Sequence, residues 1–202
     1  MQNAVTTYGG VDYSAVYNYA YYCSNNADLR NAFGPYDDDA LLRHFVSFGM
    51  NEGRRASAAF DPSSYRLEYR DLRVAFGDDW RDYYLHYIEC GRGEGRDGAG
   101  CATMQNAVTT YGGVDYSAVY NYAYYYSNHA DLQSAFGPYD DDALLRHFVS
   151  FGMNEGRRAC STFIVQVYRS NYPDLLAAFG NNLRAYYLHY ITYGQYEGRK
   201  AC

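Results

Sequence analysis

Apolar residues recur at helical spacing in one stretch that the chain repeats four times. In the first copy they stand at relative positions 0, 1, 4, 5 and 7, and they are Leu41, Leu42, Phe45, Val46 and Phe48. This spacing places them on one broad face of a helix. The tyrosine-rich stretches show no clean alternation of apolar and polar residues, so strand signals are weak. The pattern therefore predicts an all-α fold.

The chain repeats itself on two levels. Residues 1–55 recur as residues 104–158, and the two stretches differ only at positions 23, 26, 30 and 31 of the first. A weaker repeat divides each half again, into units 1 to 4, which comprise residues 17–54, 60–96, 120–157 and 163–199. Each unit is short for a core of its own, so neighbouring units are expected to stack. We predict four short three-helix units in two tandem halves, 1–99 and 100–202, with a polar, glycine-rich linker at about 97–113.

Capping residues give the expected bounds of the three helices in each unit. The first helix follows Asn18, Asp61 or Asn121, which suit an N-cap, whereas unit 4 has Ile164 there and lacks the cap. The second helix starts near an aspartate and should end at a glycine with a left-handed conformation. These residues are Asp28, Asp71, Asp131 and Asp174, and Gly34, Gly77, Gly137 and Gly180. The third helix starts from an Asp or Asn cluster, and we expect a further glycine to end it. These glycines are Gly49, Gly91, Gly152 and Gly194.

The composition narrows the classes of function. The chain has 27 tyrosines among 202 residues and a formal net charge of −6, and Lys200 is its only lysine. An acidic chain without a basic run is a poor candidate for binding nucleic acid or anionic membranes. No apolar run approaches the roughly 18 to 20 residues that span a bilayer, so no membrane insertion is expected. The first ten residues show no signal peptide.

Five cysteines give an odd number, so at least one is free or pairs between chains. They stand at positions 23, 90, 101, 160 and 202 and form no CxxC motif, which makes zinc unexpected. Tyr126 and Tyr193 replace Cys23 and Cys90 in the other half, so we expect no disulfide that both halves require. Oligomers could still form through a free cysteine such as Cys202.

Two recurring clusters have a structural and a chemical interpretation. The acidic run that starts at Asp37, and its twin at Asp140, lacks the spacing of an EF-hand, so helix capping is favoured over calcium. One histidine recurs mid-helix in every unit, with no nucleophile or second ligand at a useful spacing. Packing is favoured over catalysis for these four residues, which are His44, His86, His147 and His189.

A Glu-Gly-Arg turn closes each unit. The arginine can donate to a carboxylate in a fork, and the helix-start aspartate of the same or the next unit is a natural partner. Capture of an acidic ligand is the alternative. The arginines are Arg54, Arg96, Arg157 and Arg199.

Exposed tyrosines are the candidate ligand contacts. Residues 120–126 hold five tyrosines in seven positions, and a helix cannot bury all of them against one core. Tyrosine is a large, stiff side chain with a polar end, which suits contacts with sugars and proteins, although packing between units is at least as good an interpretation. The candidates are Tyr19, Tyr22, Tyr36, Tyr122, Tyr125 and Tyr139.

The segment "GGVDYSAVYNYAYYYSNHADLQSAFG", continued by "LLRHFVSFGMNEGRRA", resembles a known repeat family. It is similar to the tandem "AFG…HF…G…EGR" repeats of secreted and cell-surface proteins of gut Firmicutes of the Lachnospiraceae type. The resemblance covers residues 9–201. It implies an extracellular or cell-surface setting and an accessory role, and it brings no catalytic residues.

No set of nucleophile, base and orienting residue is found, so the chain is expected to be neither an enzyme nor the holder of a metal or cofactor. The first hypothesis is a non-catalytic module that binds a cell-wall or other glycan. The alternatives are an adhesin-like module that binds a host or partner protein, and a purely structural spacer.

Overall fold

The computed structural model describes residues 4–34 and 37–202, and these fold as a mostly helical protein. The chain divides into two compact parts, Met1–Asn106 and Ala107–Cys202, and their boundary lies inside the predicted linker. The all-α prediction is confirmed. None of the described helices has the length and apolar character to cross a membrane.

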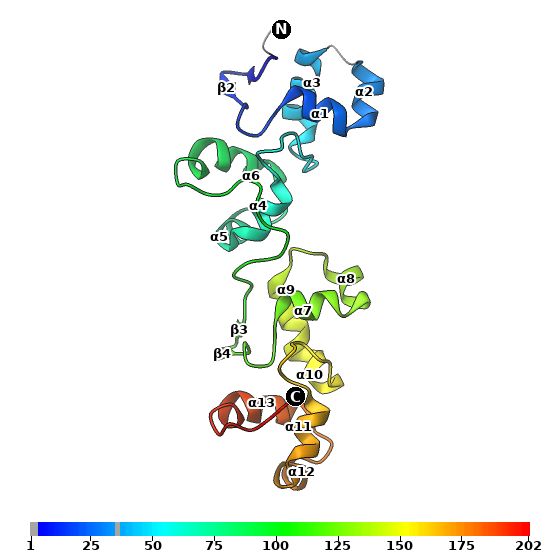
Figure 1. The fold of residues 1–202 in the computed structure, drawn as a ribbon, viewed down its shortest axis with the longest axis vertical. Coiled ribbons are helices and arrows are strands. Elements are labelled where there is room, and N and C mark those ends of the chain that lie inside the picture. The colour runs from blue at the N-terminus through cyan, green and yellow to red at the C-terminus, as the bar shows by residue number, and fades with distance from the viewer. Residues whose placement is uncertain (1–3, 35–36) are drawn as a thin grey trace. The chain divides into compact units, whose positions relative to one another are not determined.

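Each unit contains three short α-helices followed by a π-helical turn, which a fourth, one-turn helix extends in unit 3, and units 1 and 3 are preceded by a small hairpin (Figure 1). Unit 1 and its hairpin comprise β1 (Thr7–Tyr8), β2 (Val11–Asp12), α1 (Tyr19–Asn25), α2 (Ala27–Phe33), α3 (Asp38–His44) and the π-turn η1 (Phe45–Gly49). Unit 2 comprises α4 (Pro62–Glu68), α5 (Arg70–Phe76), α6 (Trp80–His86) and η2 (Tyr87–Gly91).

The second half repeats this order. Unit 3 and its hairpin comprise β3 (Thr110–Tyr111), β4 (Val114–Asp115), α7 (Tyr122–Ser127), α8 (Ala130–Phe136), α9 (Asp141–His147), η3 (Phe148–Gly152) and α10 (Met153–Glu155). Unit 4 comprises α11 (Val165–Asn171), α12 (Pro173–Phe179), α13 (Leu183–His189) and η4 (Tyr190–Gly194). In both hairpins the two strands pair antiparallel, and the first pairs Tyr8 with Val11.

The helix starts follow the predicted caps. Asn18 accepts a hydrogen bond from the backbone N–H of Tyr21, and Asp61 and Asn121 cap their helices in the same way. Ile164 provides no side-chain cap, as predicted. The clusters before the third helices also act as caps, which confirms the structural interpretation of the acidic runs. The capping residues are Asp37, Asp79, Asp140 and Asn182.

The prediction for the ends of the third helices is right in position and wrong in conformation. Gly49 and its three equivalents are each the last residue of the π-turn that follows the third helix, but none of them has a positive φ, and in unit 3 the short helix α10 follows directly. The glycine of the Glu-Gly-Arg turn takes the left-handed conformation instead, with φ of 67° at Gly53 and 70° at Gly156. The predicted ends of the second helices do have positive φ, for example 74° at Gly34.

The cores are built largely from tyrosine. In unit 1, Leu41, Leu42, Phe45 and Val46 are buried as the helical pattern predicts, together with tyrosines from α1 and from the segment before it. Phe48 was also expected on this apolar face, and it is instead 59% exposed. A π-turn holds more residues per turn than an α-helix, so the residues that follow Phe45 rotate away from the buried face.

Within each half the even unit binds the end of the odd unit through two side chains of its third helix. Arg81 donates to the carbonyl of Val46 at 2.6 Å, and the buried Tyr84 hydroxyl donates to the carbonyl of Arg54 at 2.9 Å. In the second half Arg184 and Tyr187 make the same bonds to Val149 and Arg157.

Candidate binding groove

A tyrosine–histidine hydrogen bond recurs in every unit. The hydroxyl of a buried tyrosine in the first helix bonds Nδ1 of the histidine that ends the third helix. The pairs are Tyr22–His44 at 3.1 Å, Tyr65–His86 at 3.0 Å, Tyr125–His147 at 3.1 Å and Tyr168–His189 at 2.9 Å. The predicted packing role of the histidines is therefore accompanied by a specific polar contact.

A glycine is required next to each of these hydroxyls. A Cβ built on Gly49 would lie 2.3 Å from the hydroxyl oxygen of Tyr22, and one on Gly152 would lie 2.5 Å from that of Tyr125. Gly91 and Gly194 have the same close neighbour in their units. The glycine after the apolar face is thus needed because a side chain there would collide with the tyrosine hydroxyl, and not because it ends a helix.

The arginine of each Glu-Gly-Arg turn bonds the helix-start aspartate of its own unit. Arg54 donates to Asp28 at 2.7 Å and also to Glu52. The hydrogen bond from Arg54 lowers the pKa of Asp28, and Arg157 does the same for Asp131. This ion pair connects the start of the second helix to the end of the unit, as the structural interpretation predicts.

Burial fixes the protonation of the tyrosine–histidine pairs in units 1 and 3. Burial raises the pKa of the Tyr22 hydroxyl far above neutral, so the hydroxyl keeps its proton. Burial, followed by the charge of Arg54, lowers the pKa of His44, so the imidazole is neutral at pH 7. The same causes act on Tyr125 and His147.

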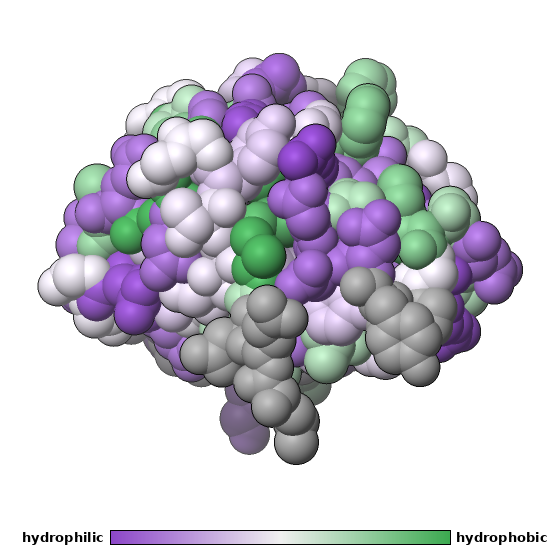
Figure 2. All heavy atoms as spheres, turned by 90° about the horizontal axis from the view of Figure 1, so that it is seen from above, coloured by the Kyte–Doolittle hydropathy of each residue, from purple (hydrophilic) through white to green (hydrophobic). Residues whose placement is uncertain are grey.

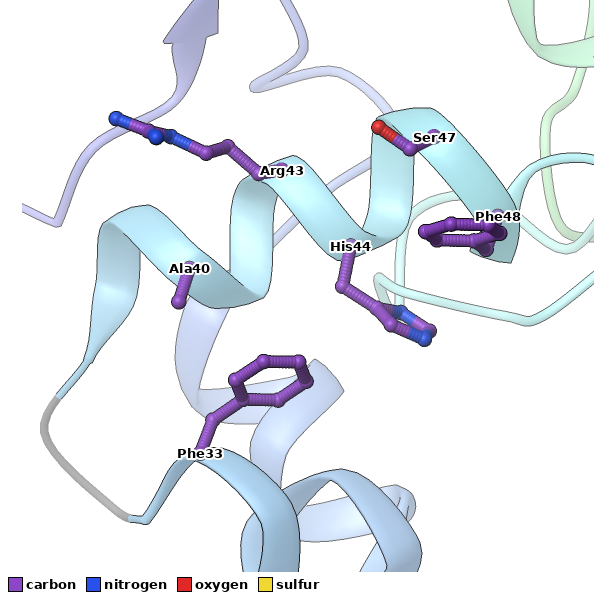
Figure 3. Close-up of a pocket in the computed structure, with 6 residues that line it drawn as sticks. All are labelled: Phe33, Ala40, Arg43, His44, Ser47 and Phe48. Atoms are coloured by element: carbon purple, nitrogen blue, oxygen red, sulfur yellow. The ribbon is translucent and has the colours of Figure 1, made fainter.

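The neutral imidazole lies between two exposed phenylalanines. Its ring centre is 5.7 Å from that of Phe33 in α2 and 5.6 Å from that of Phe48 in η1. Figure 3 shows the His44 side chain directed between these two rings, below the helix that carries it. Together with Ala40, Arg43 and Ser47, these three residues line an open groove with a volume of about 250 Å³. We call it the groove of unit 1.

Unit 3 carries the same groove, with a volume of about 240 Å³. It is lined by Phe136, Ala143, Arg146, His147, Ser150 and Phe151. Phe151 is 59% exposed, as is Phe48. Two equivalent grooves therefore stand on units 1 and 3, whose sequences are nearly identical. On the face of the molecule seen in Figure 2, hydrophobic side chains form small groups between hydrophilic ones.

The equivalents of Phe48 in units 2 and 4 are the exposed residues Cys90 and Tyr193. Leu85 replaces the rim arginine Arg43 in unit 2. The histidine and the phenylalanine of the second helix are still present there, with ring centres 5.8 Å apart for Phe76 and His86. Unit 2 thus keeps one aromatic wall and loses the other, whereas in unit 4 the exposed Tyr193 ring lies 5.6 Å from that of His189 and takes the place of the phenylalanine.

Three of the six tyrosines predicted as ligand contacts are not available to a ligand. Tyr22 and Tyr125 are fully buried and hold the histidines, and Tyr122 is also buried. That prediction is wrong for these three, because their rings fill the core between the first and third helices. Tyr19 and Tyr139 are half-buried. Tyr36 lies outside the described residues.

The groove phenylalanines were missed by sequence reasoning. A helix period assigns Phe48 to the buried face, and only the π-turn exposes it. The available signal was the glycine that directly follows Phe48, since a glycine kept inside an apolar turn marks a close approach of another group.

The five cysteines are unpaired. Cys23, Cys101 and Cys160 are buried, whereas Cys90 and Cys202 are exposed. The expectation that no disulfide is required by both halves stays a prediction.

Comparison with known proteins adds no further identification. No protein-family model, no curated protein and no solved structure matches the chain.

Proposed function

We propose that the protein is a non-catalytic repeat module that binds a partner protein through the grooves of units 1 and 3. The observation that carries the proposal is the pair of exposed phenylalanines, Phe48 and Phe151, beside a neutral histidine in two equivalent grooves. The other repeated residues described above cap helices, form ion pairs or pack in the core. Large exposed aromatic side chains in a hollow are typical anchors of binding surfaces.

A protein partner is favoured over the glycan of the first hypothesis. Two phenylalanines and an alanine make up half of the lining, and its polar side chains are one histidine, one serine and one arginine that is paired with Asp39, whereas a sugar needs several hydrogen bonds to replace those it makes with water. Three of the six tyrosines that supported the glycan hypothesis, Tyr22, Tyr122 and Tyr125, are in the core. Glycan binding remains the second candidate, carried by the half-buried Tyr19 and Tyr139.

The absence of a catalytic role is part of the proposal. The histidine has its Nδ1 engaged by a tyrosine, and no nucleophile among the described residues is hydrogen-bonded to it. We further propose the extracellular or cell-surface setting that the resemblance implies.

The test is a binding screen of the chain against extracellular proteins and against purified peptidoglycan. The double variant Phe48→Ser, Phe151→Ser removes one wall of both grooves and is expected to abolish protein binding. The matched control is Val74→Ser, which changes a 66% exposed apolar residue outside the grooves. Retained binding in the double variant, or binding to peptidoglycan alone, would contradict the proposal.

A further inference from the structure

Unit 2 binds a piece of the linker at the end of its first helix. The backbone N–H of Gln105 donates to the carbonyl of Leu67 in α4 at 2.9 Å, and the carbonyl of Gln105 accepts from Arg73 in α5 at 3.0 Å. Met104, the residue before Gln105, is buried. Unit 2 therefore holds the linker through both backbone groups of one residue, next to one buried apolar side chain.

The carbonyl that receives the linker is the acceptor of a further hydrogen bond that units 1, 2 and 3 share. In each of these units the fourth residue of the second helix is long and polar, and its side chain donates to the carbonyl of the sixth residue of the first helix. The three bonds are Arg30 to Ser24 at 3.4 Å, Arg73 to Leu67 at 2.8 Å and Gln133 to Ser127 at 3.3 Å.

Unit 4 departs from this pattern. Leu176 stands at the fourth position of α12 and is 43% exposed. Within the described residues, no side chain donates to the carbonyl of Ser170, which is the sixth residue of α11. A carbonyl at a helix end has no partner within its own helix, so it is open to a donor from outside. Unit 4 thus offers an acceptor and an exposed leucine at the place where unit 2 holds the linker; α11 and α12 are the orange helices of Figure 1.

The sequence of the bound linker piece occurs a second time in the chain. Residues 1–5 read "MQNAV", and so do residues 104–108. The last residue of the two copies is held in the same way, because the backbone N–H of Val5 donates to Asp38 at 3.1 Å and its twin donates to Asp141 at 2.9 Å. The first copy therefore carries the same residues, at the same distance from its unit, as the piece that unit 2 binds.

From this continuity with the contact in unit 2, we infer that the Leu176 surface of unit 4 binds residues 1–3 of a second copy of the chain. The backbone N–H of Gln2 donates to the carbonyl of Ser170, and the side chain of Met1 covers Leu176. The two contacting surfaces are different parts of the chain, so the interface is heterologous and joins copies head to tail. It uses neither groove, so its test is independent of the proposed function.

Sedimentation velocity of the full chain, over about a hundredfold range of concentration, measures the association. We expect the weight-average mass to rise with concentration. Leu176→Glu should keep the chain monomeric, because it would bury a carboxylate that has no partner. The matched control is Ala177→Glu, which adds the same charge at the next, also exposed residue of α12 and should associate like the wild type.

Two variants of Gln2 test the hydrogen bond itself. Gln2→Pro removes the backbone N–H and should lower the association constant about tenfold, whereas Gln2→Ala keeps the N–H and should leave it unchanged. The peptide Met-Gln-Asn-Ala-Val, added in excess, should return the wild type to monomers. All samples contain a reductant, so that the exposed Cys90 and Cys202 do not join chains.

Three results would overturn the inference. The first is a monomeric mass at every concentration, and the second is an association that Leu176→Glu or Gln2→Pro leaves unchanged. The third is an association that Ala177→Glu weakens as much as Leu176→Glu does. Phe48→Ser with Phe151→Ser should associate normally, and its failure to do so would assign self-association to the grooves instead.

Discussion

Units 1 and 2 share a scaffold and differ in what they place on it. Both carry the tyrosine–histidine bond, at 3.1 and 3.0 Å, and both need a glycine beside the tyrosine hydroxyl. Unit 1 exposes Phe48 where unit 2 has Cys90. Unit 2 carries Arg81 and Tyr84, which bind the end of unit 1.

Unit 1 lacks the two side chains with which unit 2 binds its neighbour. Asp39 and Leu42 stand where unit 2 has its docking arginine and tyrosine. The odd unit therefore provides the groove and the surface that is bound, and the even unit provides the side chains that bind it. The residues that all four units share form the scaffold of each unit. The residues that differ between odd and even units decide whether a unit carries the groove or the docking side chains.

The largest expected effect is on the shared scaffold. Gly49→Ala with Gly152→Ala places a methyl group against a buried tyrosine hydroxyl in both halves, so overpacking should lower the free energy of unfolding by about 1 to 3 kcal/mol per site. Urea unfolding followed by circular dichroism measures it. Gly91→Ala in unit 2 should lower the free energy of unfolding by a similar amount. A loss of stability confined to the odd units would contradict the statement that units 1 and 2 share one scaffold.

A smaller effect is expected where the two units meet. Tyr84→Phe keeps the ring in the core and removes the hydrogen bond to the carbonyl of Arg54, which should cost about 1 kcal/mol. Tyr187→Phe is the equivalent change in the second half. Thermal unfolding of the two variants should agree, and a negligible shift in both would show that this bond does not hold the units together.

The pH dependence of the free energy of unfolding should distinguish the contribution of the histidines from that of the carboxylates. The folded state lowers the pKa of His44 and His147 below the usual 6.5, mainly through burial. The unfolded chain then binds more protons, so stability is constant above about pH 6.5 and falls as the pH drops below it.

The aspartates held by arginines, such as Asp28, have lowered pKa values and act only below about pH 4. Unfolding free energies of the wild type between pH 8 and 5 should therefore fall, and those of His44→Gln with His147→Gln should fall less. An unchanged slope in this variant would contradict the assignment.

Local chemistry made part of this architecture predictable. Caps and the aspartate partners of the Glu-Gly-Arg turns follow from residue types at fixed positions, and Asn18, Asp61 and Arg54 behave as expected. The fold class followed from the helical period.

The groove was not predictable in the same way. Tyr22 and His44 are 22 residues apart, and nothing local pairs them. The five tyrosines of residues 120–126 gave no indication of which would be buried. The π-turn decides the exposure of Phe48, and a regular helix period places that residue in the core.

The central claim is that the shared residues hold the fold and the groove phenylalanines do not. The direct measurement is the free energy of unfolding of Phe48→Ser with Phe151→Ser, by urea titration beside the wild type. Because both rings are exposed, the account predicts a difference within about 0.5 kcal/mol. A loss of more than about 2 kcal/mol would mean that these rings belong to the core, and it would contradict the account.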